Sequence, residues 1–208
     1  MATPKSQRIG IWIIAIVLTI GTLGSFLVMG LSVNNQANDQ ARYQAAYTEY
    51  QTAVAAQAKE LSAKYYTEFS QYSTVPAVFD AAGVTELTKT DLKVGDGAEV
   101  TATSEYSAYY IGWNPKGVIF DQSIADGALK APLAGGSMIT GWNEGIIGMK
   151  FGGARELTIP SDKAYGATGS GDNIPADTPL KFIVMIIPKV TEVTVPAALL
   201  EYYASQSS

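Results

Sequence analysis

The sequence predicts an α+β protein in which a membrane-spanning helix and a long helical stalk precede a β-rich domain. Three observations support this: a long apolar run without charges, a following segment without Gly or Pro, and a remainder with strand-like runs separated by turn residues. The 208 residues accordingly divide into an N-terminus (1–8), an anchor (9–33), a stalk (34–75), a β-rich domain (76–190) and a tail (191–208).

The composition excludes several classes of function. A net charge of −5 without clustered Lys and Arg argues against a nucleic-acid partner. The chain has no His and no Cys, which excludes imidazole bases, Ser-His-Asp triads, thiol nucleophiles and zinc sites built from these residues. No nucleotide-binding motif and no calcium-loop spacing is present, so we expect no metal and no cofactor. The absence of Cys also fits an extracytoplasmic location.

Residues 9–33 form the charge-free run. A membrane-spanning helix needs about 20 apolar residues, whereas the apolar part of a signal peptide has about 7–15. The length therefore favours an uncleaved anchor over a removed signal peptide. Because Lys5 and Arg8 precede the run, the positive-inside rule places the N-terminus in the cytoplasm and the rest of the chain outside the plasma membrane.

Residues 34–72 favour a helix, since they are rich in Ala, Gln, Glu and Lys. Successive apolar positions average about 3.6 residues per step, the period of a straight helix rather than a heptad coiled coil. We expect this stripe to pack on the protein's own body or on a partner helix; a solvated spacer is the alternative. The stripe consists of Tyr43, Tyr47, Tyr50, Val54, Ala58, Leu61, Tyr65, Phe69 and Tyr72.

The β-rich domain shows strand-like segments enriched in β-branched and aromatic residues. The NPKG sequence has Pro in its second and Gly in its fourth position, as a type I turn prefers. The strand-like segments are residues 84–113, broken at a VGDG turn, and residues 118–120, 154–160 and 180–188.

Residues 139–149, ITGWNEGIIGM, have apolar residues at the spacing of one helix face. Three glycines lie between them, and each costs about 0.5–1 kcal/mol relative to Ala in a helix. Residues 160–179 form a long loop rich in Gly, Pro and Asp, and loops of this length in a compact domain are usually functional. Pro196 is placed to begin a short terminal helix.

Several of these segments together resemble an FKBP-type peptidyl-prolyl isomerase domain. The resemblance runs in unbroken order from about Val84 to Val190, roughly half of the chain. It implies a twisted antiparallel sheet wrapped around one short helix, with an apolar pocket between them. The segments that carry it are YYIGW, VIFDQS, GGSMITGWNEGIIGMKFGGARELTIPSDKAYGATG and IPADTPLKFIVMI.

The resemblance also assigns roles to residues. Trp142 would form the floor of the pocket, and Ile174 its rim. The backbone N–H of Ile139 and the hydroxyl of Tyr165 would donate hydrogen bonds to substrate carbonyls, and Asp121 would supply a carboxylate near Tyr110. The walls would be formed by Tyr110, Phe120, Leu129, Met138, Ile139, Tyr165 and Phe182.

Two departures from the family pattern affect the pocket. Many relatives have an aromatic residue in the loop where this chain reads ALKAPLAGG, which leaves Leu129 and Ala131. The SGDNIP loop is more polar and richer in Gly than is common in the family. Both departures bear on substrate preference. In the helix, Gly141 and Gly145 would let the sheet and a bound proline approach closely.

The expected function is a membrane-anchored prolyl isomerase that acts on proline-containing polypeptides and assists protein folding outside the membrane. Such a site needs no nucleophile, because it only has to bind the twisted X–Pro amide better than either planar isomer. The alternative is a non-catalytic proline-peptide-binding or chaperone module, suggested by the changed wall at Leu129 and Ala131. In a third interpretation, the stalk recruits a membrane partner and the domain serves as a spacer.

Overall fold

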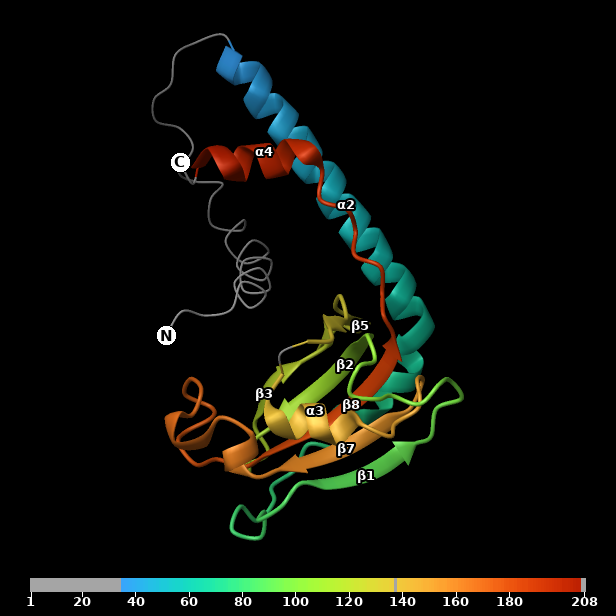
Figure 1. Cartoon of the computed structure of the whole chain (residues 1–208), viewed down its shortest axis with the longest axis vertical. Helices are drawn as coiled ribbons and strands as arrows, with labels where there is room; N and C mark the ends of the chain where they lie inside the picture. Colours follow the sequence, from blue (N-terminus) through green and yellow to red (C-terminus); the bar gives the residue numbers. More distant parts are fainter. Residues whose placement is uncertain (1–34, 137, 207–208) are drawn as a thin grey trace. The chain divides into compact units, whose positions relative to one another are not determined.

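A computed structural model describes residues 35–206 except residue 137 (Figure 1). The anchor expected at residues 9–33 lies outside the described residues. Within the described ranges, no helix is long and apolar enough to cross a membrane. The chain forms two compact units: one is Tyr50–Thr194, and the other combines Met1–Glu49 with Val195–Ser208.

The larger unit contains an antiparallel sheet in which β8 and β2 are the central strands. Its order is β1-β7-β8-β2-β3, with the short strand β6 also paired to β2, and a separate hairpin joins β4 to β5. The strands are β1 (Thr88–Lys93), β2 (Tyr106–Trp113), β3 (Ile119–Gln122), β4 (Ile124–Ala125), β5 (Ala128–Leu129), β6 (Leu133–Ala134), β7 (Ala154–Ile159) and β8 (Leu180–Pro188).

The strand expected across residues 84–113 is shorter than predicted. After the VGDG turn, the chain forms only an isolated bridge between Glu99 and Lys150 before β2 begins. The Ser104 Oγ accepts a hydrogen bond from the Thr101 N–H at 2.9 Å, and the Ser104 N–H donates to the Thr101 carbonyl at 3.2 Å. These local bonds compete with ladder pairing and fold the segment into a turn.

The β2–β8 pair is buried on both faces, and side chains alternate between two cores with the period of two that a strand imposes. One core, which we call the α3-side core, includes Tyr106, Ala108, Trp142, Ile146, Met149, Leu157, Ile159, Phe182 and Val184. The other, the α2-side core, includes Phe69, Tyr72, Tyr109, Ile111, Trp113, Leu129, Ile183 and Met185.

Helix α3 (Thr140–Ile146) crosses one face of the sheet (Figure 1). Its glycines allow a very close approach to β7. A Cβ on Gly141 would lie 2.2 Å from the Ile159 Cγ2, and one on Gly145 would lie 2.7 Å from a Leu157 methyl carbon. Carbon atoms that are not bonded do not approach this closely, so a side chain at either position would force Ile159 or Leu157 to move. The neighbours are β7 side chains, which accounts for these glycines by sheet packing alone.

Arg155 on β7 fixes the C-terminal end of α3 to the sheet. Its buried guanidinium donates from Nη1 to the carbonyls of Gly145 (2.8 Å) and Ile147 (3.1 Å). Its Nε and Nη2 donate to the Asp91 carboxylate on β1. The last carbonyls of a helix have no partner within the helix. A strand side chain therefore satisfies them and ties α3 to two strands.

Helix α2 (Asn35–Ser70) continues into a short 3-10 helix (Gln71–Thr74), and its last turns belong to the larger unit. Phe69 is 0% exposed and packs in the α2-side core. Glu68 forms a 2.6 Å ion pair with Lys93 at the end of β1. The compact unit that contains the sheet therefore also includes the part of the expected stalk from Tyr50 onward.

The apolar stripe expected at residues 43–72 is the less exposed face of this helical segment, because all of its residues are buried or half-buried. In the smaller unit, Tyr43 packs against Tyr202 of α4 (Ala197–Gln206) with ring centroids 4.8 Å apart. Arg42 pairs with Glu201 at 2.9 Å. The terminal helix expected after Pro196 is present, and the stripe packs on the protein's own body in both units.

A chain that begins at residue 76 should be much less stable than one that begins at residue 50. The shorter fragment loses Phe69 and Tyr72 from the α2-side core, and burial of such side chains stabilises by about 1.5–3 kcal/mol each. We expect its unfolding temperature, followed by circular dichroism, to fall by roughly 10–20 °C. Equal unfolding temperatures for the two fragments would show that α2 is not part of the folded unit.

Tyr109→Phe should stabilise the protein, because the buried Tyr109 hydroxyl has no hydrogen-bond partner among the described residues. The expected gain in the free energy of unfolding is about 1 kcal/mol in urea titrations. The matched control is Tyr106→Phe, which removes the acceptor of the Trp142 indole N–H and should cost about 1–3 kcal/mol. A loss of stability in Tyr109→Phe would contradict this.

Tyr109→Phe should also change how the stability of the protein depends on pH. Burial raises the pKa of the Tyr109 hydroxyl above its ordinary value of 10.0. As the pH rises past 10, the unfolded chain therefore loses this proton before the folded chain does, and stability falls. Tyr109→Phe should reduce that alkaline loss of stability.

Candidate functional site

Four aromatic rings meet in and beside the α3-side core, and we call this group the aromatic site. Trp142 on α3 makes edge-to-face contacts with Tyr110 of β2, at 5.7 Å between centroids, and with Phe182 of β8, at 5.5 Å. Phe120 of β3 packs edge-to-face on Phe182, also at 5.5 Å. Such arrangements match the electrostatics of aromatic rings. The sheet and the helix thus bring together four of the predicted residues.

Gly112 makes room for two of these rings. A Cβ at this position of β2 would lie 2.7 Å from both the Phe120 Cζ and the Phe182 Cε1. The rings therefore occupy the space that any other residue would fill. Gly112 was not singled out from the sequence, although it stands two residues after Tyr110 and so faces the same side of the strand.

Trp142 lies beneath the other rings, where it is only 1% exposed. Its indole N–H donates a 3.1 Å hydrogen bond to the Tyr106 hydroxyl. Burial raises the pKa of Tyr106, so this hydroxyl stays protonated. Tyr106 was not singled out from the sequence; its place on the same strand face as Tyr110 is the signal that could have found it. This bond fixes the orientation of the Trp142 ring.

Tyr110 and Asp121 form the polar edge of the aromatic site. The Tyr110 hydroxyl donates to the Asp121 Oδ2, and the Asp121 Oδ1 accepts from the Gln122 N–H at 2.8 Å. Burial, followed by this hydrogen bond, raises the pKa of Tyr110. Burial and then the Asp121 charge raise the pKa of Tyr165, which is 38% exposed. Both hydroxyls are therefore protonated donors at neutral pH.

Ile139 lies directly before α3, in an extended conformation with φ −57° and ψ 150°. Its carbonyl accepts from the N–H groups of Trp142 and Asn143. No described residue accepts a hydrogen bond from the Ile139 N–H. Met138 is half-buried against the α3-side core, and its carbonyl accepts from the Asn143 side chain at 3.1 Å.

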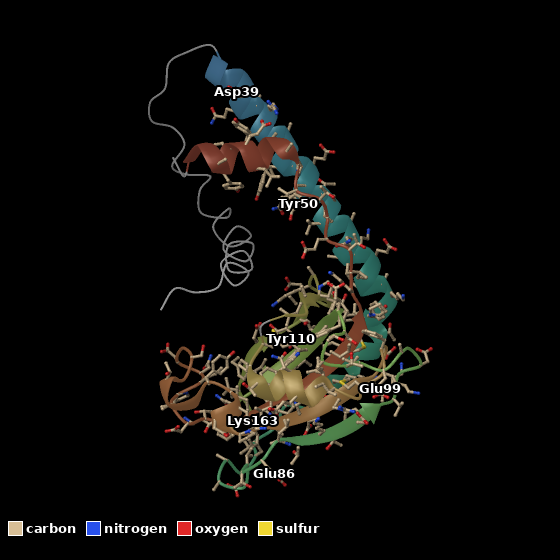
Figure 2. The ribbon with its side chains drawn as sticks, in the orientation of Figure 1. Asp39, Tyr50, Glu86, Glu99, Tyr110 and Lys163 are labelled. Atoms are coloured by element: carbon tan, nitrogen blue, oxygen red, sulfur yellow. The ribbon has the colours of Figure 1, made fainter. Side chains whose placement is uncertain are left out.

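The long loop at residues 160–179 is tied to the domain at two places. Lys163, labelled in Figure 2, pairs with Glu144 of α3 at 2.5 Å, just before Tyr165. The buried Asn114 side chain donates to the Asn173 carbonyl at 2.9 Å. Ile174 was expected at a rim, yet it is buried in the α3-side core. The buried side chain of Ile174 therefore also holds the polar, Gly-rich loop against the domain.

Leu129 is not brought to the aromatic site. It is 4% exposed and lies in the α2-side core with Phe69 and Tyr109. The reason is the β4–β5 hairpin, in which Leu129 pairs with Ile124 and donates its backbone N–H to the Ser62 hydroxyl of α2. Ala131 is exposed. The expected wall position of Leu129 is thus replaced by packing against the helix.

The β-rich domain is similar to a known family of proteins. A family model described as FKBP-type peptidyl-prolyl cis-trans isomerase matches residues 90–187, which include every residue of the aromatic site. An FK506-binding protein of Neisseria meningitidis is 43% identical over 98 residues, covering 47% of this chain and 90% of that protein. The chain belongs to the FKBP-type peptidyl-prolyl cis-trans isomerases.

Other relatives agree with this FKBP-type assignment. A probable FK506-binding protein of Corynebacterium glutamicum is 43% identical over 104 residues, covering 49% of this chain and 86% of that protein. Among solved structures, a peptidyl-prolyl cis-trans isomerase from Pseudomonas syringae is 29% identical to this chain, with a TM-score of 0.43. The match covers 76% of this chain and 97% of the Pseudomonas syringae chain. The family assignment rests on the sequence matches.

In this FKBP-type domain, Asp121→Ala should lower kcat/KM by about tenfold. The variant removes the acceptor that holds the Tyr110 hydroxyl, and a hydrogen bond to a charged group contributes about 1.5–3 kcal/mol. The assay follows cis-to-trans conversion of a proline tetrapeptide. Glu86→Ala removes an exposed carboxylate elsewhere and should leave the rate unchanged. Wild-type kinetics in Asp121→Ala would exclude this residue from the site.

Proposed function

We propose that this FKBP-type isomerase is anchored in the plasma membrane by residues 9–33 and assists the folding of proline-containing polypeptides outside the membrane. The charge-free run, with Lys5 and Arg8 before it, is the observation that carries this proposal. The absence of Cys agrees with it, because a cysteine-free chain is unaffected by an oxidising compartment.

The proposed mechanism needs no covalent step. The barrier to rotation about X–Pro, roughly 20 kcal/mol, arises from amide resonance that is lost when the bond twists. A site that binds the twisted amide better than both planar isomers lowers this barrier. The aromatic site supports this, because the half-buried rings of Tyr110 and Phe120, packed against the core that contains Trp142, would give a proline ring an apolar contact in place of water.

Two donors would orient the substrate carbonyls beside that surface. They are the Ile139 N–H, which has no acceptor among the described residues, and the half-exposed Tyr165 hydroxyl, whose pKa is raised by burial. Donors held in place before the reaction stabilise the twisted state without a cost of reorganisation. Asp121 would hold Tyr110 at the polar edge and set the local field.

The alternative function is a non-catalytic proline-peptide-binding or chaperone module, motivated by the change at Leu129 and Ala131. Leu129 packs in the α2-side core, so the case for this alternative rests on Ala131, which is exposed. The isomerase assay on a proline tetrapeptide distinguishes the two functions.

Protease treatment of intact cells tests the orientation. We expect added protease to remove the isomerase domain from intact cells while a cytoplasmic marker protein survives. A domain that is digested only after lysis would overturn the proposed orientation. In parallel, alkaline washing of the membranes tests the anchor: an uncleaved anchor keeps the protein in the pellet, whereas a removed signal peptide releases it.

A further inference from the structure

Ser62 is a buried polar residue of α2 that directly follows Leu61 of the apolar stripe. It is 8% exposed and lies one turn before Tyr66 and two turns before Phe69. Its hydroxyl accepts a 2.9 Å hydrogen bond from the Leu129 backbone N–H, across 67 residues of sequence. A buried backbone N–H without an acceptor costs about as much as a lost hydrogen bond. Ser62 therefore supplies a partner that the short β4–β5 hairpin cannot provide for itself.

The hairpin contacts α2 at its turn and at its second strand. Its turn residues, Asp126 and Gly127, both have positive φ (50° and 73°), the conformation of a type I′ turn, which matches the twist of two paired strands. A Cβ on Gly127 would lie 4.0 Å from the Tyr66 hydroxyl, so the turn touches the helix. With Leu129 in the α2-side core, the hairpin has contacts to α2 at its tip and at its second strand.

The base of the hairpin contacts the strand that carries Tyr110. The Lys130 N–H, next to Leu129, donates to the Ser123 carbonyl at 2.8 Å. The buried Ser123 hydroxyl accepts from the Tyr110 N–H at 2.9 Å, and the Ser123 N–H donates to the Tyr110 carbonyl at 2.8 Å. Ser123 follows Asp121 by two residues, so one short segment holds both partners of the Tyr110–Asp121 hydrogen bond.

We propose that Ser62 is a positioning residue of the isomerase site. By fixing the β4–β5 hairpin it holds Ser123 against Tyr110, and it thereby orients the Tyr110 hydroxyl toward Asp121. Helix α2 then contributes to the function of the isomerase domain, because its contact with the hairpin determines how Tyr110 and Asp121 lie at the polar edge. The route runs through hydrogen bonds of 2.8–2.9 Å between described residues.

The test compares Ser62→Ala with Ser70→Ala in the full chain purified in detergent, once wild-type isomerase activity has been measured. Ser70 lies on the same helix and its side chain caps nothing. We expect Ser62→Ala to lower kcat on a proline tetrapeptide by about threefold to tenfold, with KM within about twofold of wild type, because the polar edge is disturbed and the apolar surface is not. Ser70→Ala should have wild-type kinetics.

Amide hydrogen exchange supplies a second measurement. The Leu129 amide should exchange at least about tenfold faster in Ser62→Ala, while the Ile183 amide in the central strand keeps its protection. Faster exchange at Leu129 without a loss of kcat would show that the hairpin does not position the site, and this would overturn the proposal. A uniform loss of protection at both amides, with equal changes in kcat and KM, would likewise assign Ser62 a purely structural role.

If Ser62→Ala fails to fold, a pair of variants with side chains of the same shape supplies the test. Ser62→Thr keeps a hydroxyl acceptor and Ser62→Val does not, while both side chains are β-branched and carry a similar cost in a helix. We expect Ser62→Thr to retain kcat within about twofold and Ser62→Val to lose about threefold to tenfold. Equal kcat values for Thr and Val would overturn the proposal.

Discussion

The burial of both faces of the β2–β8 pair is the constraint on which the rest of the structure depends. The two strands pair along their whole length, from Tyr106 with Pro188 to Trp113 with Lys181, and nearly every side chain on them is buried. A sheet with two apolar faces needs a cover on each. Helix α3 covers one face and the last turns of α2 cover the other, so the aromatic site and the stalk are packed on opposite sides of the same strands.

Close packing then determines the details of the site. The seven-residue helix α3 is too short to be stable by itself, and its glycines weaken it further. It exists because Gly141 and Gly145 let it approach β7, because Trp142 and Ile146 are buried beneath it, and because Arg155 satisfies its last carbonyls. Ile139 directly precedes this helix, and its N–H has no acceptor among the described residues, so the available donor is a product of how the helix begins.

Much of this fold could be predicted from the sequence. The strands with strong β-branched character, the short helix and the straight-helix period of the stalk all correspond to observed elements, since local pattern and tertiary packing agree there. The resemblance to the family also named the four rings that meet in the aromatic site, and their role in binding stays a prediction. The alternation of β2 itself places Tyr106 and Tyr110 on one face and Tyr109 on the other.

The features that the sequence did not predict depend on long-range contacts, which leave no periodic pattern in the sequence. Leu129 was expected to form a wall of the pocket, but an Asp-Gly turn and one hydrogen bond from its N–H to the Ser62 hydroxyl hold it on the other face of the sheet. A bond between residues 67 positions apart has no local signature. The place where Phe69 packs has no local signature either, since this residue reads as part of a continuous helix and only the folded structure shows its ring in the α2-side core.

The choice of tyrosine as the hydroxyl donor has a consequence for where such an enzyme can work. With no His and no Cys, the chain contains no side chain whose ordinary pKa lies between about 5 and 8. The two tyrosines beside Asp121 have pKa values raised by burial, so their protons are retained across that interval and beyond it. The hydroxyl donors of the site therefore keep their charge state while the surrounding medium changes in acidity. The site would therefore present the same set of donors from mildly acid to mildly alkaline conditions.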